Sequence, residues 1–281
     1  MNRIAVLGAG IMGAGIAQAA ARAGMQVILR DLQKSLVEDG LRTIEANLDQ
    51  EIKMGQIKPA DKDLVLSRIE ATTDLAQLYD VDLVNEAVVE NMAVKKQLFA
   101  ELDDICPRNT ILASNTSSLS ITEIAAATRR QDQVLGMHFF KPVATTYLVE
   151  LVRGMETSDD TINVGKDFAQ RIGKFSVVVN RESPGFIVNR ILIPYINEAV
   201  FAYVEGLAGV EEIDTAMKLG AGMPEGPLEM ADRIGLDTVY SVMMVFYNEF
   251  RDPKYRPHPF FSTMVRAGYY GIKSGKGFYN Y

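Results

Sequence analysis

The stretch Arg3-Ile-Ala-Val-Leu-Gly-Ala-Gly-Ile-Met-Gly-Ala-Gly-Ile-Ala17 begins as an apolar run and continues directly into glycines at positions 8, 10 and 13. This pattern predicts a β-strand, a tight turn and the first turn of a helix. Gly8 allows the turn, Gly10 leaves room beside bare backbone, and Gly13 lets the helix pack close to the strand. Such a helix begins with backbone N–H groups that can bind a pyrophosphate.

A glycine pattern of this kind is weak evidence by itself, because it also occurs in ordinary glycine-rich turns. Here a second apolar run, Val27-Ile-Leu-Arg30, ends at Asp31, 18 residues after Gly13. That spacing is close to the one expected of a carboxylate that accepts hydrogen bonds from both hydroxyls of a ribose. Together these features predict a dinucleotide site formed by Gly8, Gly10, Ile11, Met12, Gly13 and Asp31.

Length and composition indicate a globular protein of about two domains, because 281 residues with 48% hydrophobic content can bury sizeable cores. The net charge of −7 argues against a basic face for nucleic acid or an anionic membrane. No apolar run approaches the ~18 residues of a membrane span, and no charged leader precedes the first strand. We therefore expect a cytoplasmic protein with neither a nucleic-acid nor a membrane partner.

Residues that ligate metals are scarce. Cys106 is the only cysteine, which excludes disulfides within the chain and thiolate clusters. His138 and His258 are the only imidazoles, which argues against a zinc site. The chemistry is expected to come from acids, hydroxyls, one histidine and a cofactor, with no metal.

Short apolar runs alternate with helical patterns through the first two thirds of the chain. Beyond the first two strands, we expect strands over 69–72, 81–84, 110–113, 133–137, 147–152 and 175–179. Helices are expected over 34–53, 92–105, 121–128 and 159–172. This alternation is typical of a largely parallel sheet with both faces covered.

The composition changes after Ser183-Pro-Gly185, where the pattern becomes helical over 186–205, 210–219 and 236–250, with a break at Pro224-Glu-Gly-Pro227. We predict an α/β fold in which a Rossmann-type, mostly parallel sheet domain over 1–183 precedes an all-helical domain over 184–281. The first helix of the second domain has more apolar surface than a small domain readily covers, which predicts a symmetric homodimer. Its apolar residues are Ile191, Leu192, Ile193, Ile196, Val200, Phe201 and Val204.

Three polar clusters follow predicted strands, at the ends where open parallel sheets bind ligands. They are Glu86–Glu90 with Lys95, Ser114–Ser118, and His138–Pro142. His138 is a candidate acid/base group, since imidazole titrates near neutrality, although a strand-end histidine can also be satisfied by backbone. Glu150 could accept the other ring N–H, or could face solvent.

Two further patterns favour structural interpretations. His258 lies in the proline-rich loop Arg256-Pro-His-Pro259, where a structural role is expected. Tyr269 and Lys273 match a Tyr-x-x-x-Lys pair that acts on a shared helix face, but Gly271 between them argues that the match is accidental.

Five motifs in their expected order resemble the L-3-hydroxyacyl-CoA dehydrogenase family, and the resemblance covers essentially the entire chain. They are Gly8-Ala-Gly-Ile-Met-Gly13, Ala113-Ser-Asn-Thr-Ser-Ser-Leu119, His138-Phe-Phe140, Ser183-Pro-Gly-Phe-Ile-Val-Asn-Arg190 and Gly275-Lys-Gly-Phe-Tyr279. The resemblance implies an NAD-dependent enzyme of fatty acid and butanoate metabolism, with an acyl-CoA substrate bound between a Rossmann domain and a helical dimerisation domain.

The resemblance also assigns roles to single residues. His138 would be the general acid/base and Glu150 its orienting partner. Ser117 and Asn189 would hold the substrate oxygen or the histidine, although Asn189 could instead be an ordinary polar surface residue. The positions expected to contact the cofactor, besides the glycine turn, are Asp31, Glu90, Lys95, Ser117 and Lys273.

Three departures from the family pattern leave the substrate open. Lys141 replaces the usual asparagine, the segment 143–147 differs from the common Pro-Val-Met-Lys, and Lys53 is the only base where relatives place several for the CoA phosphates. One interpretation is interconversion of 3-hydroxybutyryl-CoA and acetoacetyl-CoA. The alternatives are a dehydrogenase of a free hydroxy acid, of the carnitine or gulonate type, and a non-catalytic NAD-sensing protein.

Overall fold

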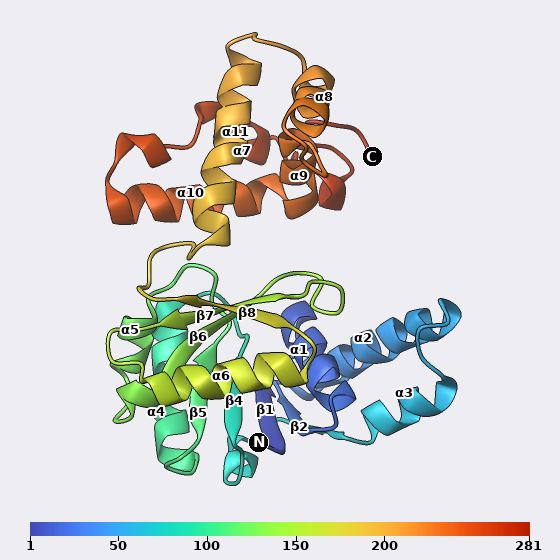
Figure 1. Ribbon diagram of the computed structural model, residues 1–281, viewed down its shortest axis with the longest axis vertical. Helices are drawn as coiled ribbons and strands as arrows, with labels where there is room; N and C mark the ends of the chain where they lie inside the picture. The colour runs from blue at the N-terminus through green and yellow to red at the C-terminus, as the bar shows by residue number, and fades with distance from the viewer. The chain divides into compact units, whose positions relative to one another are not determined.

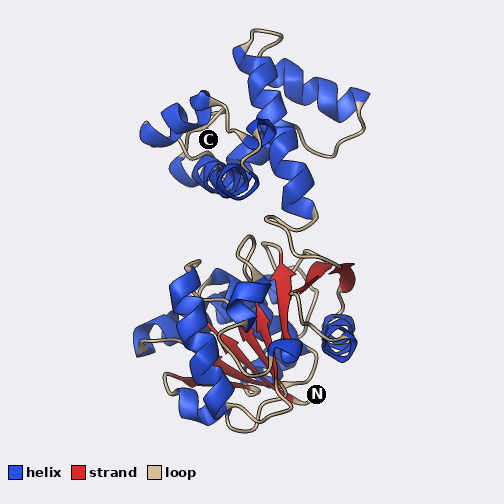
Figure 2. Cartoon of the chain, turned by 90° about the vertical axis from the view of Figure 1, so that its left-hand side faces the viewer, coloured by secondary structure: helices blue, strands red, loops and turns tan.

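The computed structural model describes residues 1–281 and divides the chain into two units, Met1–Ser183 and Pro184–Tyr281. The first unit is built around one sheet, and the second is formed by helices (Figures 1 and 2). The predicted fold class, a mostly parallel Rossmann-type sheet followed by a helical part, is confirmed. None of the helices is both long and apolar enough to cross a lipid bilayer.

The sheet has eight strands in the order β3-β2-β1-β4-β5-β6-β7-β8. All neighbouring strands are parallel except β6 and β7, which are antiparallel. The strand order reverses between β1 and β4, and in open α/β sheets such a reversal creates a crevice at the carboxyl ends of the strands. The strands are β1 (Arg3–Leu7), β2 (Gln26–Arg30), β3 (Ile69–Thr72), β4 (Leu83–Glu86), β5 (Ile111–Ser114), β6 (Val134–Phe139), β7 (Leu148–Arg153) and β8 (Phe175–Val179).

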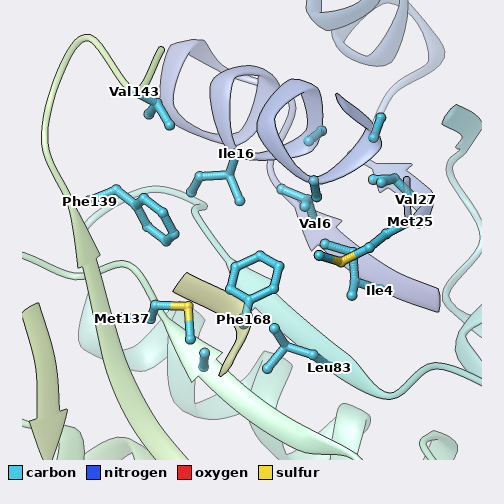
Figure 3. Close-up of a cluster of buried hydrophobic side chains, with 14 of the residues drawn as sticks. Ile4, Val6, Ile16, Met25, Val27, Leu83, Met137, Phe139, Val143 and Phe168 are labelled. Carbon is cyan, nitrogen blue, oxygen red and sulfur yellow. The ribbon is translucent and has the colours of Figure 1, made fainter. Parts of the chain in front are cut away.

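Helices cover both faces of this sheet (Figure 2). On one face Ile16 of α1 and Phe168 of α6 pack against strand residues such as Val6 and Leu83 (Figure 3). Each such fully buried side chain contributes roughly 1.5–3 kcal/mol of transfer free energy. The helices are α1 (Ile11–Arg22), α2 (Lys34–Lys53), α3 (Pro59–Leu66), α4 (Met92–Ile105), α5 (Ile121–Ala125) and α6 (Asp159–Arg171), with 3₁₀ turns η1 (Leu75–Leu78) and η2 (Gln131–Gln133).

Strands β4 and β6 end two residues later than the sequence pattern predicts. The reason in β6 is that His138 and Phe139 continue the antiparallel ladder with Glu150 and Val149. Glu86 similarly pairs with Ser114 on β5. These polar residues are therefore buried strand positions rather than the first residues of loops.

The second unit contains helices that the sequence pattern did not predict. The sequence pattern places Pro227 in a break, whereas the structure places it in the first turn of a helix, where its missing N–H has no cost. The core includes Ile193, Ile196 and Val200, so these three do not belong to an outer apolar face. The elements are α7 (Val188–Val204), α8 (Val210–Gly220), α9 (Pro227–Ile234), α10 (Leu236–Phe250) and α11 (Pro259–Arg266), with 3₁₀ turns η3 (Pro253–Tyr255) and η4 (Ile272–Ser274).

The C-terminal motif Gly275–Tyr279 is held by a buried carboxylate. Asp232, 1% exposed, accepts hydrogen bonds from the backbone N–H groups of Phe278 (2.9 Å) and Tyr279 (2.8 Å). A Cβ on Gly277 would overlap this carboxylate, so the close approach requires glycine. Burial raises the pKa of Asp232 despite these hydrogen bonds, which act in the opposite direction.

Candidate active site

The glycine turn after β1 has the geometry of an anion cradle. A Cβ on Gly13 would overlap the carbonyl oxygen of Gly8, whereas nothing lies within 4 Å of the position that a Cβ on Gly10 would take. Gly8 has φ +95°, which favours glycine. Because no side chain caps α1 at Gly10, the first N–H groups of the helix are presented at the turn. These features fit the pyrophosphate of a dinucleotide.

Asp31 lies beside this turn, directly after β2. Its Oδ2 atom accepts a hydrogen bond from the backbone N–H of Ala9 (2.7 Å), and its Oδ1 atom accepts one from Leu32 (2.6 Å). The carboxylate is therefore fixed next to the glycines. Arg30 is directed elsewhere, since its Nε–H donates to the carbonyl oxygen of Thr73 (3.1 Å). This arrangement fits a carboxylate that binds a ribose.

His138 and Glu150 face each other across the antiparallel β6–β7 pair. The Nδ1 atom of His138 lies 2.7 Å from Oε2 of Glu150, with the two residues 6% and 1% exposed. The ring of Phe140 packs against the imidazole, with a centroid distance of 4.4 Å. A buried carboxylate so close to a ring nitrogen fixes the orientation of the imidazole.

The carboxyl ends of β5 and β6 are joined beside this pair. The side-chain oxygen of Asn115 accepts a hydrogen bond from the backbone N–H of Phe139 (2.8 Å), the residue after His138. Asn115 in turn donates its own N–H to the carbonyl oxygen of Glu86 (2.7 Å). The loop after β5 is thus tied to both neighbouring strands.

A buried ionic network lies at the ends of β4 and β5. The ammonium of Lys95, 1% exposed, lies 2.6 Å from Glu86 Oε1 and 3.4 Å from Glu90 Oε2. Glu86, fully buried, also accepts hydrogen bonds from Ser114 Oγ (2.6 Å) and the N–H of Val88 (2.7 Å). Each buried charge therefore has charge-assisted partners, which is the condition for tolerating it inside a protein.

Glu90 extends this network to the loop that contains Ser117. Its Oε1 atom accepts hydrogen bonds from Thr116 Oγ1 (2.5 Å), the N–H of Ser117 (3.1 Å) and Ser118 Oγ (3.5 Å). The side chain of Glu90 is 41% exposed, whereas Lys95 is enclosed. Glu90 and Lys95 are both predicted cofactor contacts, but only Glu90 is accessible. Lys95 is buried and forms ion pairs with the carboxylates of Glu86 and Glu90.

Three members of this constellation, Glu86, Ser114 and Asn115, belong to the polar clusters that the sequence places at strand ends, but the sequence assigns none of them an individual role. The available signal was their place at strand ends. The pairing that makes them important depends on which strands become neighbours, and this cannot be inferred from spacing along the chain.

The remaining predicted site residues lie in different surroundings. Lys53 is the exposed last residue of α2. Asn189 belongs to the first turn of α7 in the second unit. Lys273, also in the second unit, is ion-paired with Asp237 and lies 5.7 Å from the ring centroid of Tyr270.

His258 and the Tyr269–Lys273 pattern, for which the sequence predicts no catalytic role, have hydrogen-bond partners near them in the chain. His258 caps α11 by accepting a hydrogen bond from the N–H of Phe260 (3.1 Å), and burial lowers its pKa. The hydroxyl of Tyr269 accepts a hydrogen bond from the ammonium of Lys276 (3.2 Å) and not from Lys273. No cluster of three or more His, Cys, Asp or Glu side chains could hold a metal ion.

Comparison with known proteins places this geometry in a family. Residues 3–183 match the 3-hydroxyacyl-CoA dehydrogenase NAD binding domain, and residues 185–281 match the C-terminal domain of the same family. The chain is 48% identical over 279 residues to 3-hydroxybutyryl-CoA dehydrogenase of Clostridioides difficile, with 99% of each chain covered.

Two other relatives are similar to this chain over nearly their full length. A probable 3-hydroxybutyryl-CoA dehydrogenase of Bacillus subtilis (strain 168) is 47% identical over 281 residues, covering 100% of this chain and 98% of the relative. The crystal structure of (S)-3-hydroxybutyryl-CoA dehydrogenase PaaH1 from Ralstonia eutropha has a TM-score of 0.96 at 48% identity, covering 100% of this chain and 99% of that one. The chain therefore belongs to the 3-hydroxyacyl-CoA dehydrogenase family, with an NAD-binding domain followed by the family's C-terminal domain.

Proposed function

We propose that this chain interconverts L-3-hydroxybutyryl-CoA and acetoacetyl-CoA, with NAD as its cofactor. The observation that carries the proposal is the buried pair formed by His138 and Glu150, 2.7 Å apart, on neighbouring strands of a dinucleotide-binding sheet. The relatives that are 47–48% identical and bear the 3-hydroxybutyryl-CoA dehydrogenase name support the substrate.

NAD, when bound, supplies the acceptor or donor of the hydride. His138 takes the proton of the 3-hydroxyl group during oxidation and returns it to the 3-oxo oxygen during reduction. Glu150 keeps the ring in one orientation and stabilises the imidazolium that forms. Ser117 and Asn189 are proposed to hydrogen-bond the substrate oxygen or the histidine and so to hold the reacting geometry.

The remaining binding roles are proposed residue by residue. In the first unit, Asp31 binds the adenosine ribose, Glu90 contacts the cofactor, and Lys95 supports Glu90. Lys53 and Lys273 are proposed to contact the CoA moiety and the cofactor respectively. The anion cradle at Gly8–Gly13, including Ile11 and Met12, supports the pyrophosphate role.

We further propose that residues 184–281 bind the substrate and form a homodimer. Leu207 and Leu219 are 80% and 82% exposed, and Ile191 of α7 is 69% exposed, which leaves apolar surface for a second copy. Light scattering tests the oligomeric state, and a monomer at assay concentration would contradict the dimer. A cytoplasmic location is consistent with a single buried cysteine, and imaging of a tagged chain tests it.

The decisive experiment compares NADH oxidation with acetoacetyl-CoA and with free acetoacetate. Turnover of the thioester alone supports the proposal. Preference for the free acid would favour the hydroxy-acid alternative, and NADH binding without any turnover would favour a sensor. In the same assay, His138→Gln is expected to lower kcat by roughly 10²- to 10⁴-fold while NADH binding, measured by calorimetry, persists.

A further inference from the structure

The segment that connects β6 to β7 joins the strand of His138 to the strand of Glu150. It is held on one side by α1, because Val143 is buried against that helix near Ile16 (Figure 3). A Cβ placed on Gly15 of α1 would lie only 2.8 Å from the Cβ of Val143, so the two segments are in close contact.

Lys174 holds the same segment from the other side. Its ammonium donates hydrogen bonds to the carbonyl oxygens of Val143 (2.5 Å) and Thr146 (2.6 Å). The next residue, Phe175, donates its backbone N–H to the carbonyl oxygen of Tyr147 (2.7 Å). Lys174 and Phe175, at the start of β8, therefore bind three carbonyl groups within the five residues 143–147.

The backbone of Lys174 is itself fixed. Helix α6 ends in a turn in which Gly173 has φ +74° and donates to the carbonyl of Gln170 (3.0 Å), while Lys174 donates to the carbonyl of Ala169 (2.8 Å). This hydrogen-bonded cap holds the main chain from which the Lys174 side chain extends. Burial lowers the pKa of Lys174, as expected of a cation drawn partly out of water.

We propose that Lys174 is a positioning residue for the His138–Glu150 pair. By fixing the connection between the two strands, it holds the register in which Glu150 lies opposite His138. Register matters here because a slip of one residue would turn Glu150 to the other face of the sheet. The expected loss of kcat rests on the proposed function, whereas the role of Lys174 in holding the strand connection does not.

The kinetic test uses Lys174→Met, which removes the donors and keeps the length of the side chain. We expect kcat for acetoacetyl-CoA reduction to fall about 10-fold, less than the ~100-fold cost of a full 1 Å misplacement, with the KM for NADH unchanged. Lys174→Arg keeps a cationic donor and should restore most of kcat. Lys166→Met, at an exposed position on α6, is the matched control.

A double mutant separates positioning from general weakening of the fold. If Lys174 acts through the pair, Lys174→Met should change kcat little in a Glu150→Gln background, and multiplicative losses would overturn the proposal. Lys174→Gln, which retains one donor group, replaces Lys174→Met if that variant does not fold.

Hydrogen exchange tests the clamp without any turnover. The amides of Thr145 and Thr146, which donate to the carbonyl of Pro142 (3.3 and 3.1 Å), should exchange faster in the folded variant, while amides of β1 stay protected. Unchanged exchange at Thr145 and Thr146 would overturn the clamp. A wild-type chain inactive on acetoacetyl-CoA would instead overturn the proposed function and leave this result standing.

Discussion

Replacing Glu150 with glutamine removes one negative charge from beside His138 and changes the shape of the side chain little. The original contact is 2.7 Å long and both partners are buried, so solvent screens it weakly. A hydrogen bond to a charged group contributes about 1.5–3 kcal/mol, against about 0.5–1.5 kcal/mol for a neutral one. The protonated ring that forms during oxidation would lose roughly the difference, and the amide can also present its NH₂ group to the ring and misorient it.

Since about 1.4 kcal/mol corresponds to a factor of ten in rate, the lost difference of about 1–1.5 kcal/mol lowers kcat about 10-fold. Misorientation of the ring adds to this loss, so Glu150→Gln is expected to lower kcat about 10- to 100-fold in total. The assay is steady-state reduction of NAD with L-3-hydroxybutyryl-CoA, the direction in which the protonated ring forms, together with circular dichroism and NADH binding to show that the variant is folded. Glu156→Gln, at an exposed position shortly after β7, provides the control. A folded Glu150→Gln variant with wild-type kcat would refute the orienting role of Glu150.

Three further predictions follow from other residues. Asp31 should repel a 2′-phosphate, so kcat/KM is expected to be higher with NADH than with NADPH, and the reverse order would contradict its ribose role. Burial alone would raise the pKa of Asp103, but hydrogen bonds from Arg129 and Arg130 outweigh it and lower the pKa below the usual 3.8. The stabilisation from Asp103 is therefore present above about pH 4 and lost as the pH falls through the lowered folded-state pKa. In urea unfolding, Asp103→Asn should cost about 3 kcal/mol at neutral pH, since it leaves the buried Arg130 with backbone carbonyl acceptors but no carboxylate, and the difference should narrow in acid; a constant difference would argue against this origin. Asn85 is fully buried with no hydrogen-bond partner for either amide atom, so Asn85→Val should raise the free energy of unfolding by about 1 kcal/mol, with a lowered Tm as the contrary result.

Much of the first unit could be predicted because its strands are apolar runs of ordinary length separated by clear turn signals. The glycine turn and Asp31 have a fixed spacing that reflects one local structure, and the structure places them side by side through the Ala9–Asp31 hydrogen bond. Element ends were less predictable. Glu86, the last residue of β4, and His138, the last but one of β6, are polar, and their place in the sheet depends on partners that are distant in the sequence.

Buried polar groups mark the other limit of the sequence pattern. Lys95 and Glu86 are charged, so hydrophobic periodicity assigns them to a surface, yet the structure buries both and pairs them. Asn85 lies between Val6 and Ala113 in the sheet. The hydrophobic pattern predicts an apolar residue at such a position and gives no sign that a polar amide is buried there. A one-dimensional pattern cannot distinguish a charge that has found its partner in the interior from a charge that faces water.

The segment 141–147 shows how a departure in sequence can leave a site intact. Its contacts with Lys174 and Phe175 run through main-chain carbonyl groups, which every residue type provides. Val143 is the one buried side chain of the segment, and it packs beside Gly15. Lys141 and the other exposed positions can therefore vary without altering the strand connection. Because these contacts use the main chain, the connection that holds the register of the His138–Glu150 pair does not depend on which side chains occupy the exposed positions of the segment.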